Sequence, residues 1–574
     1  MQPLWLYCRI YTSRLYMCKG FRPWQRTNNL FIFAGILFSQ NIFNLRFLKI
    51  FNNQLFHVLL ISFLVCITRI AYLFSPSGQI GDADEAVFGL MALQIMRLEE
   101  FPIYCWGAHY AGTPICYLAA IMFKLFGYGF VQLRMAMLPV TLFSTILFYQ
   151  IYRKLFDDSQ ALMGAIVLIF CPFFVLRYTM SALGGYGETF LGISLIVLLS
   201  WKIKQNGSKD NVIFYLLLGI ISGFFLYILF LVLPAVIVFG LSLLLAEKKY
   251  SKKLISFLLF FIGNLIGIFP MIIYNIMNQG GTFLRAAGRS ADLGREAISI
   301  PLSELSKQII LNKLNYLKDW AFSAPELFGV YLLPSDVGNI FLKIAGFFIL
   351  LLLIYFVILA FTAKMPVQRK YLLKQFAWFL IILVIFQWIA NLNRSRHLLP
   401  IALIIPIALF TIINFHVYFK KTIILLLLLT LWCSLQLGDW SNRMNKSFFN
   451  PYPIISVMED KKITRFYGSY WTTYPIMFAS KAKLIGAPYL LPFNEILGDR
   501  SPDWTQKVLM SKEPAFVFAE NEHQLMKEFV SFITKNNINS TSINIKEVTI
   551  FWNLSKPVRA KVNKTKWKTQ FIIE

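Results

Sequence analysis

The chain has 574 residues, of which 57% are hydrophobic and 14% charged, with a formal net charge of +27 and a mean hydropathy of +0.61. This excess of apolar side chains excludes a soluble globular protein and predicts a polytopic membrane protein. The basic residues stand in short clusters between apolar runs, which favours membrane topology over nucleic-acid binding.

The apolar runs predict a helical membrane domain over residues 55–437, preceded by a basic cytoplasmic segment over 1–54. Windows of about 20 apolar residues predict about 11 spans. They cover residues 55–74, 133–151, 160–176, 188–201, 212–228, 230–246, 254–276, 339–362, 375–392, 397–415 and 422–437. Basic clusters such as Arg153/Lys154 and Lys202/Lys204 follow alternate spans, and the positive-inside rule makes them cytoplasmic.

This topology leaves three segments outside: 75–132, 277–338 and 438–574. The last is polar and predicts a small α/β domain. Strands are expected over Ile463–Tyr467, Ala515–Ala519 and Ile545–Trp552, and helices over Trp471–Ser480 and 521–535.

The first outside segment opens with an acidic cluster, Gly81-Asp82-Ala83-Asp84-Glu85-Ala86. The apolar residues at 87–96 then repeat as on one face of a helix lying on the membrane, and 114–127 predicts a second interfacial helix. Helix capping explains one such acid but not three. The surplus favours a functional carboxylate, a general base whose pKa is raised by neighbouring acids and partial desolvation.

Polar residues in two further stretches are candidates for substrate binding. His109 and Tyr110 lie among aromatic and small residues of the first segment. An interfacial aromatic belt is the alternative for the rings, and a purely hydrogen-bonding histidine is the alternative for His109. Tyr186 and Glu188 follow Gly184-Gly185 at the start of a span. An acid at that depth is costly unless it has a function, with helix capping as the alternative.

Several basic residues are exceptions to the positive-inside rule, because they lie on the predicted outer side. They are Arg285 and Arg289 in the second segment, and Arg396 with His397 at the mouth of a late span. The planar guanidinium suits phosphate, so these residues predict an anionic ligand. Contact with anionic lipid headgroups is the alternative for the loop arginines.

These segments, in this order, resemble the GT-C class of polyprenyl-phosphate-dependent glycosyltransferases. The similarity is to its bacterial branch related to protein O-mannosyltransferases and lipid A aminoarabinose transferases. It rests on Asp84-Glu85, the stretch from Phe101 to Phe126, Gly184-Gly185-Tyr186-x-Glu188, and Arg396-His397-Leu398-Leu399-Pro400. Relatives often have Tyr where His397 stands.

The resemblance implies an inverting transfer of a sugar from a polyprenyl phosphate to a glycolipid, envelope glycan or protein. Asp84 would be the base, and Glu85 and Glu188 would orient the acceptor or the sugar, with Asp82 as a further substrate-binding candidate. Arg396 would stabilise the leaving phosphate. No cofactor is implied with certainty, and a divalent cation at Asp82-Ala83-Asp84 is not favoured.

Two other functions compete with this interpretation. A transporter or flippase of lipid-linked sugars would carry mid-span ionisable residues and internal repeats. In this chain the acids cluster in outside loops, and no repeat is visible. A structural or interaction protein would use the C-terminal domain to bind a partner. The composition favours a bacterial inner membrane, with the site and the C-terminal domain on the periplasmic side, over a eukaryotic ER membrane.

Overall fold

The structure is a computed structural model that describes residues 54–206, 212–246, 250–286, 350–390, 392, 395–415, 449–489, 499–563 and 568–573. The predicted span over 422–437 and the predicted boundary at 437/438 lie outside these residues. So does nearly all of the predicted cytoplasmic segment 1–54. The domain limits therefore stay predictions.

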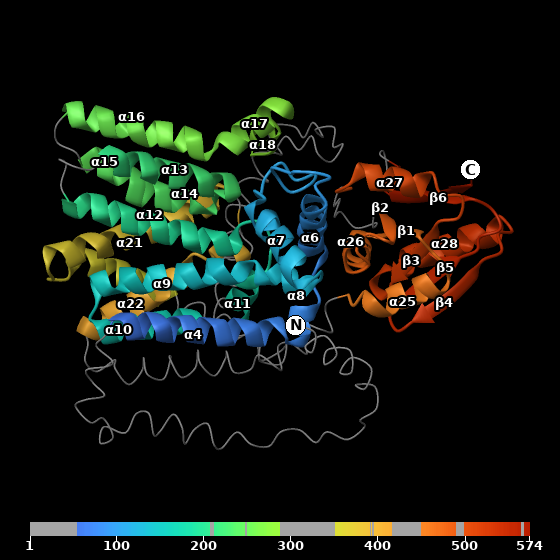
Figure 1. Ribbon diagram of the computed structural model, residues 1–574, viewed down its shortest axis with the longest axis horizontal. Coiled ribbons are helices and arrows are strands. Elements are labelled where there is room, and N and C mark those ends of the chain that lie inside the picture. The colour runs from blue at the N-terminus through green and yellow to red at the C-terminus, as the bar shows by residue number, and fades with distance from the viewer. Residues whose placement is uncertain are drawn as a thin grey trace, which may run out of the picture. The chain divides into compact units, whose positions relative to one another are not determined.

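The described residues before 449 form helices joined by loops, as predicted (Figure 1). Its longer helices are α4 (Gln54–Leu73), α6 (Ala83–Met96), α7 (Pro114–Phe126), α9 (Met137–Leu155), α10 (Asp158–Ile169), α12 (Tyr186–Asn206), α13 (Val212–Ile228), α16 (Tyr250–Gly267), α21 (Val367–Ile389) and α22 (Ile401–Phe415). The shorter ones are α5 (Pro76–Gln79), α8 (Phe130–Met135), α11 (Phe173–Met180), α14 (Leu233–Ala235), α15 (Ser242–Ala246), α17 (Phe269–Met277) and α18 (Gly281–Ala286).

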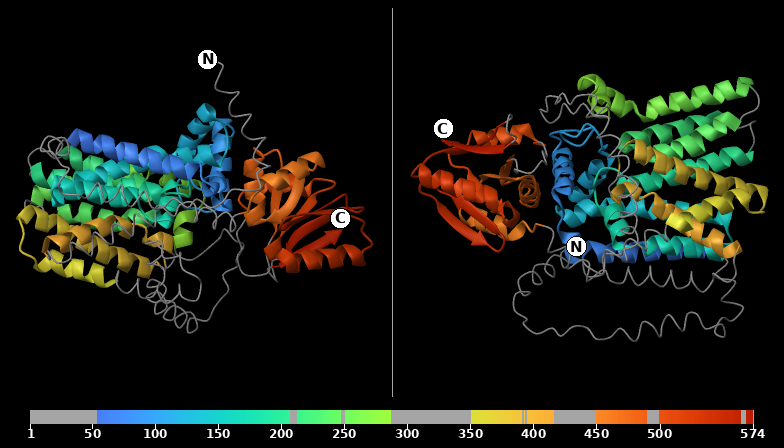
Figure 2. Two further views of the ribbon diagram at one scale, coloured as in Figure 1. Left: turned by 90° about the horizontal axis from the view of Figure 1, so that it is seen from below. Right: turned by 180° about the vertical axis from the view of Figure 1, so that it is seen from behind.

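Among the described residues, five helices are long and apolar enough to cross a bilayer, and a bent pair makes a sixth candidate. The five are Gln54–Leu73, Phe130–Leu155, Tyr186–Gln205, Tyr250–Gly267 and Val367–Ile389. The described part of each other predicted range contains helical residues, several of them in short helices. In Figures 1 and 2, α9, α12, α13 and α16 run side by side.

The bent pair consists of α10 and α11, which meet at 78°. Pro172 cannot donate a backbone hydrogen bond, so the helix stops before it. Buried Arg69 of α4 donates to the carbonyl oxygens of Ile169 at 2.5 Å and Leu168 at 3.4 Å. This contact satisfies helix-end acceptors that the break exposes. The bend brings α11, and with it Arg177, to the start of α6.

Helix α6 is buried on nearly every face, including Val87, Leu90, Met91 and Leu93. The apolar face predicted to lie on the membrane packs instead against α7 and against α26 (Tyr470–Ala479) of the C-terminal region. Periodicity showed that this face is apolar, but the covering element comes from almost four hundred positions later in the chain. Helix α7 keeps exposed apolar residues such as Ile121, Leu125 and Phe126, as an interfacial helix does.

The C-terminal region is an α/β unit, as predicted. Its main sheet has the order β2-β1-β3-β5-β4, in which β1 is parallel to β2 and β3, and β5 is antiparallel to β3 and β4. The strands are β1 (Arg465–Ser469), β2 (Ile485–Tyr489), β3 (Ala515–Ala519), β4 (Thr541–Ile545) and β5 (Val548–Trp552), with β6 (Val558–Asn563) and β7 (Lys568–Ile573) as a separate pair. The helices are α25 (Tyr452–Asp460), α26, α27 (Pro502–Leu509) and α28 (His523–Lys535).

Candidate active site

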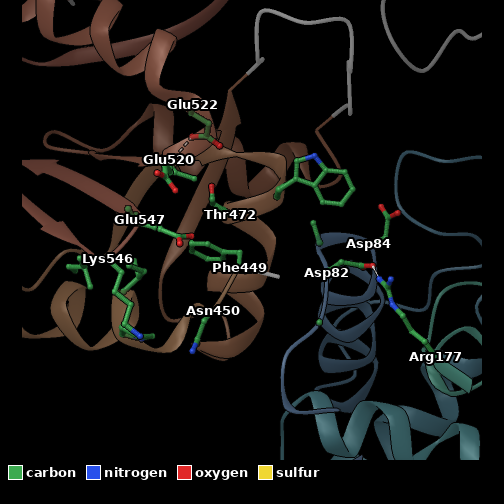
Figure 3. Close-up of a pocket in the computed structure, with 18 of the residues that line it drawn as sticks. Asp82, Asp84, Arg177, Phe449, Asn450, Thr472, Glu520, Glu522, Lys546 and Glu547 are labelled. Carbon is green, nitrogen blue, oxygen red and sulfur yellow. Dashed lines mark hydrogen bonds and ion pairs between the residues drawn. The ribbon is translucent and has the colours of Figure 1, made fainter. Parts of the chain in front are cut away.

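A cavity of about 770 Å³ opens where the acidic cluster meets the C-terminal unit. One wall is formed by Asp82 and Asp84 at the start of α6, Arg177 and Tyr178 of α11, and Arg396. The opposite wall comes from the C-terminal unit, including Asn450, Trp471 and Thr472 (Figure 3). We refer to this cavity as the cleft.

Asp82 is the N-cap of α6. Its Oδ1 accepts a hydrogen bond from the backbone N–H of Glu85 at 2.9 Å, and its Oδ2 lies 3.0 Å from Nη2 of Arg177. Figure 3 shows this ion pair at the wall of the cleft. Capping therefore accounts for one acid of the cluster, as the sequence suggested.

Asp84 lies two residues after Asp82, in the first turn of α6, and lines the cleft. Its Oδ1 accepts a hydrogen bond from the hydroxyl of Tyr470 at 2.6 Å. Burial, followed by the negative charge of Asp82, raises the pKa of Asp84 above its ordinary value, while Tyr470, Arg500 and Arg396 oppose the rise. A carboxylate with a raised pKa at the edge of a cleft has the properties of a general base.

Glu85 points away from the cleft into the protein. Both of its oxygens are bound by Arg134, from Nε at 2.7 Å and from Nη2 at 2.5 Å, and both side chains are about 1% exposed. Arg134 also donates to the carbonyl oxygen of Ser77, and the backbone N–H of Ala182 donates to Glu85. This network joins the start of α6 and the last turn of α8 to the loop after α11, so Glu85 holds the wall of the cleft together.

Arg396 lies at the mouth of α22 in the short helix Ser395–Leu398 and lines the cleft. Its guanidinium stands 5.8 Å from the ring centre of Tyr186. Its Nε is buried and, among the described residues, has no hydrogen-bond partner. No acidic side chain of the described part of the chain forms an ion pair with it. The cation therefore has the capacity to bind an anion from outside the protein.

The neighbours of Arg396 are Tyr186 and His397. The rings of these two residues lie 6.5 Å apart, and the carbonyl oxygen of His397 accepts a hydrogen bond from Gln387 at 2.6 Å. The histidine backbone thus anchors the turn that carries Arg396.

The remaining predicted residues lie elsewhere. His109 accepts or donates a hydrogen bond at 2.6 Å with the hydroxyl of Tyr274, depending on its tautomer. Tyr110 is 37% exposed and contributes to the electrostatic surroundings of Arg396. Glu188 is 5% exposed, and its Oε1 has no hydrogen-bond partner among the described residues. None of these three lines the cleft as described.

The loop arginines cannot be placed at the cleft. Arg285 belongs to α18, but its side chain lies outside the described residues, as does the whole of Arg289. Their predicted role in anion binding stays a prediction.

Sequence reasoning missed four residues around Asp84 and Glu85: Arg134, Arg177, Tyr470 and Arg500. Arg134 had a usable signal, because an arginine at the outer end of a predicted span is an exception to the positive-inside rule. Arg177 stands beside the Gly-Gly turn and had the same signal. Tyr470 and Arg500 had none, because nothing local ties them to α6.

The Asp-x-Asp pair offers little to a cation here. The Asp82 oxygens are engaged by the helix backbone and Arg177. Within the described ranges, no group of three His, Cys, Asp or Glu side chains stands close enough together to hold a metal ion.

No family model and no curated protein sequence matches the chain. Solved structures to which it is similar include the oligosaccharyltransferase AglB from Archaeoglobus fulgidus in complex with an inhibitory peptide and a dolichol-phosphate. That match has 12% identity and a TM-score of 0.47, and covers 90% of this chain and 75% of that chain. Another is ArnT from Cupriavidus metallidurans bound to undecaprenyl phosphate, with 10% identity and a TM-score of 0.41, covering 87% of this chain and 98% of that chain.

These two neighbours are GT-C polyprenyl-phosphate-dependent glycosyltransferases, the class that the motifs of this chain resemble. A fold supports many activities, so the function of this chain is argued from its own site residues.

Proposed function

We propose that this protein is an inverting glycosyltransferase. It transfers a sugar from a polyprenyl-phosphate donor to an acceptor on the outer face of a membrane, with Asp84 as the general base. The observation that carries the proposal is that a proton-accepting carboxylate and a cation without an acidic partner line the same cleft.

The chemical step needs both groups. The Asp84 carboxylate takes the proton of an acceptor hydroxyl or amine, whose oxygen or nitrogen then bonds to the anomeric carbon of the sugar. The bond from that carbon to the phosphate oxygen breaks on the opposite side, so the configuration inverts. The polyprenyl phosphate leaves with the bonding electrons, and the proton remains on Asp84.

Arg396 stabilises the phosphate as its charge increases. The Arg396 guanidinium stands against Tyr186, and no carboxylate among the described residues forms an ion pair with it. A preorganised cation aimed at developing charge lowers the barrier without reorganisation. Arg177 supports the same wall but is paired with Asp82, so its share of the phosphate contact is smaller.

Glu85 is a positioning residue in this proposal. Its ion pair with Arg134 holds the first turn of α6, which carries Asp84. Glu188, Tyr186, His109 and Tyr110 stay candidates for contact with the sugar or the acceptor.

The orientation follows from the basic residues. Helices α9 and α12 begin near the cleft, and their other ends carry Arg153/Lys154 and Lys202/Lys204. The positive-inside rule makes these ends cytoplasmic, which supports a cleft on the outer face of a bacterial inner membrane.

The proposal is tested by mass spectrometry of envelope glycolipids and glycoproteins from a deletion strain complemented with the wild-type gene or Asp84→Asn. We expect a sugar to be missing in the deletion strain, to return with the wild-type gene, and to stay missing with Asp84→Asn at equal membrane levels. A flippase predicts full restoration by Asp84→Asn, and this result would overturn the proposal.

A further inference from the structure

Asp84 is in direct contact with a side chain that lies almost four hundred positions away in the sequence. The Tyr470 hydroxyl, on the first turn of α26, donates to Asp84 Oδ1 at 2.6 Å. In the described part of the chain, this is the one hydrogen bond made by the Asp84 side chain. Asp84 also lines the cleft.

Tyr470 is itself held in place. The Nε of Arg500 donates to the Tyr470 oxygen at 3.4 Å, and the guanidinium stands 5.6 Å from the centre of the Tyr470 ring. Arg500 Nη1 donates to the carbonyl oxygen of Trp106 in the first outside segment at 3.1 Å. Its backbone N–H donates to Tyr474 one turn further along α26 at 2.6 Å. Arg500 thus ties α26 to the segment that contains Asp84.

The helix that carries Tyr470 is also packed directly onto α6. Tyr470 is 4% exposed, and Phe478 at the far end of α26 lies so close to Gly89 that an added Cβ would stand 2.3 Å from its ring. Arg97, just after α6, donates to the carbonyl oxygen of Lys481 at 3.3 Å. Contacts along the length of both helices therefore define the position of the Tyr470 hydroxyl.

We infer that Tyr470 is a positioning residue for Asp84, so that the C-terminal unit completes the reactive carboxylate rather than only covering the cleft. This inference rests on the proposed function, in which Asp84 is the base. The hydrogen bond orients the carboxylate with Oδ2 toward the acceptor and stabilises its ionised form.

The charged and titratable groups around Asp84 come from several elements. They are Asp82 beside it, Tyr470 of α26, Arg500 before α27, Arg396 before α22, and Tyr186 of α12. Burial and Asp82 raise the pKa of Asp84, whereas Tyr470, Arg500 and Arg396 hold it down. Removing the Tyr470 hydroxyl therefore raises this pKa further. As the pH is lowered, the Asp84 carboxylate then becomes protonated at a higher pH than in the wild-type chain.

The test is a pH titration of the purified full chain by infrared difference spectroscopy. The carboxyl band that is absent from Asp84→Asn identifies Asp84. We expect the midpoint of this band to rise by about 1 pH unit in Tyr470→Phe, because a hydrogen bond to the charged form is removed. Tyr467→Phe is the matched control: it removes one hydroxyl from β1 of the same unit, and the groups that shift the pKa of Asp84 are others. Its midpoint should equal that of the wild-type chain.

An unchanged midpoint in Tyr470→Phe, or an equal rise in Tyr467→Phe, overturns the inference. If Tyr470→Phe does not fold, Tyr470→Leu takes its place, and an unchanged midpoint there has the same meaning. These outcomes are separate from the proposed function, which fails only if Asp84→Asn still transfers sugar.

Discussion

Neighbouring carboxylates at the start of α6 belong to two different regions of the molecule. Glu85 lies in the helical core, where Arg134 binds both of its oxygens and almost no surface remains exposed. Asp84 lies at the cleft, where a tyrosine hydroxyl is its hydrogen-bond donor and the nearest charges include another acid. The two acids are adjacent in the sequence, yet Glu85 is neutralised by an ion pair, whereas Asp84 is not paired with a cation among the described residues and lines the cleft.

One turn of α6 thus places one carboxylate in the core and the other at the cleft. Successive residues of a helix point about 100° apart, so adjacent acids face different surroundings. The buried pair is costly to break from one side, because the remaining charge stays in a medium of low dielectric. The Glu85–Arg134 ion pair therefore gives rigid support to the Asp84 carboxylate, which faces the cleft.

If the Asp84 carboxylate is the general base, its loss should lower the transfer rate strongly and change the stability little. We expect Asp84→Asn to lower the transfer rate by about 10²- to 10⁴-fold, the usual contribution of a general base. The free energy of unfolding should change by less than about 1 kcal/mol, because the side chain keeps its size and its acceptor for Tyr470. Rates in isolated membranes and detergent unfolding measure the two quantities. A large loss of stability would mean that Asp84 is structural.

At the buried Glu85–Arg134 ion pair we expect a large effect on stability. Arg134→Met leaves the Glu85 carboxylate buried and unpaired, which should cost about 3–5 kcal/mol of stability. Unfolding of the purified chain by sodium dodecyl sulfate measures this loss. The double variant Arg134→Met with Glu85→Leu should recover most of it, because no isolated charge remains. No recovery in the double variant would contradict an ion-pair origin.

A smaller effect is expected at the cationic wall of the cleft. Arg396→Gln should weaken binding of undecaprenyl phosphate by about 10- to 100-fold, since a charge-assisted hydrogen bond contributes about 1.5–3 kcal/mol. Arg153→Gln is the control, because Arg153 is paired with Asp158 at the far end of α9. Equal affinities of Arg396→Gln and the wild-type chain would remove Arg396 from the phosphate site.

The smallest effect concerns the packing of α6 on α26. Gly89→Ala would bring a Cβ to 2.3 Å from the Phe478 ring, which must move. Overpacking of this kind costs about 1–3 kcal/mol and should slow transfer by displacing Tyr470. Adding Phe478→Leu should restore part of the rate. A Gly89→Ala chain with unchanged rate and stability would show that the helices tolerate a shift.

Much of the fold was predictable because it depends on local composition. Apolar runs indicated the membrane helices, and the strand over Ala515–Ala519 was placed at its observed bounds. The helix over 471–480 was placed within one residue at each end. The break at Pro172 was not predicted, because it also requires Arg69 from another helix to satisfy the exposed carbonyl oxygens.

The amino-acid sequence by itself determined that this is a helical membrane protein with a polar α/β unit at its C-terminal end. It also singled out Asp84 and Arg396, because charges are rare in such a chain and stand out where they occur. Only the tertiary structure decided that Glu85 is paired with a buried arginine, that Arg177 forms an ion pair at the wall of the cleft, and that Tyr470 donates a hydrogen bond to Asp84. Composition and periodicity report the surroundings that a residue needs, whereas contacts between distant segments depend on how whole helices pack.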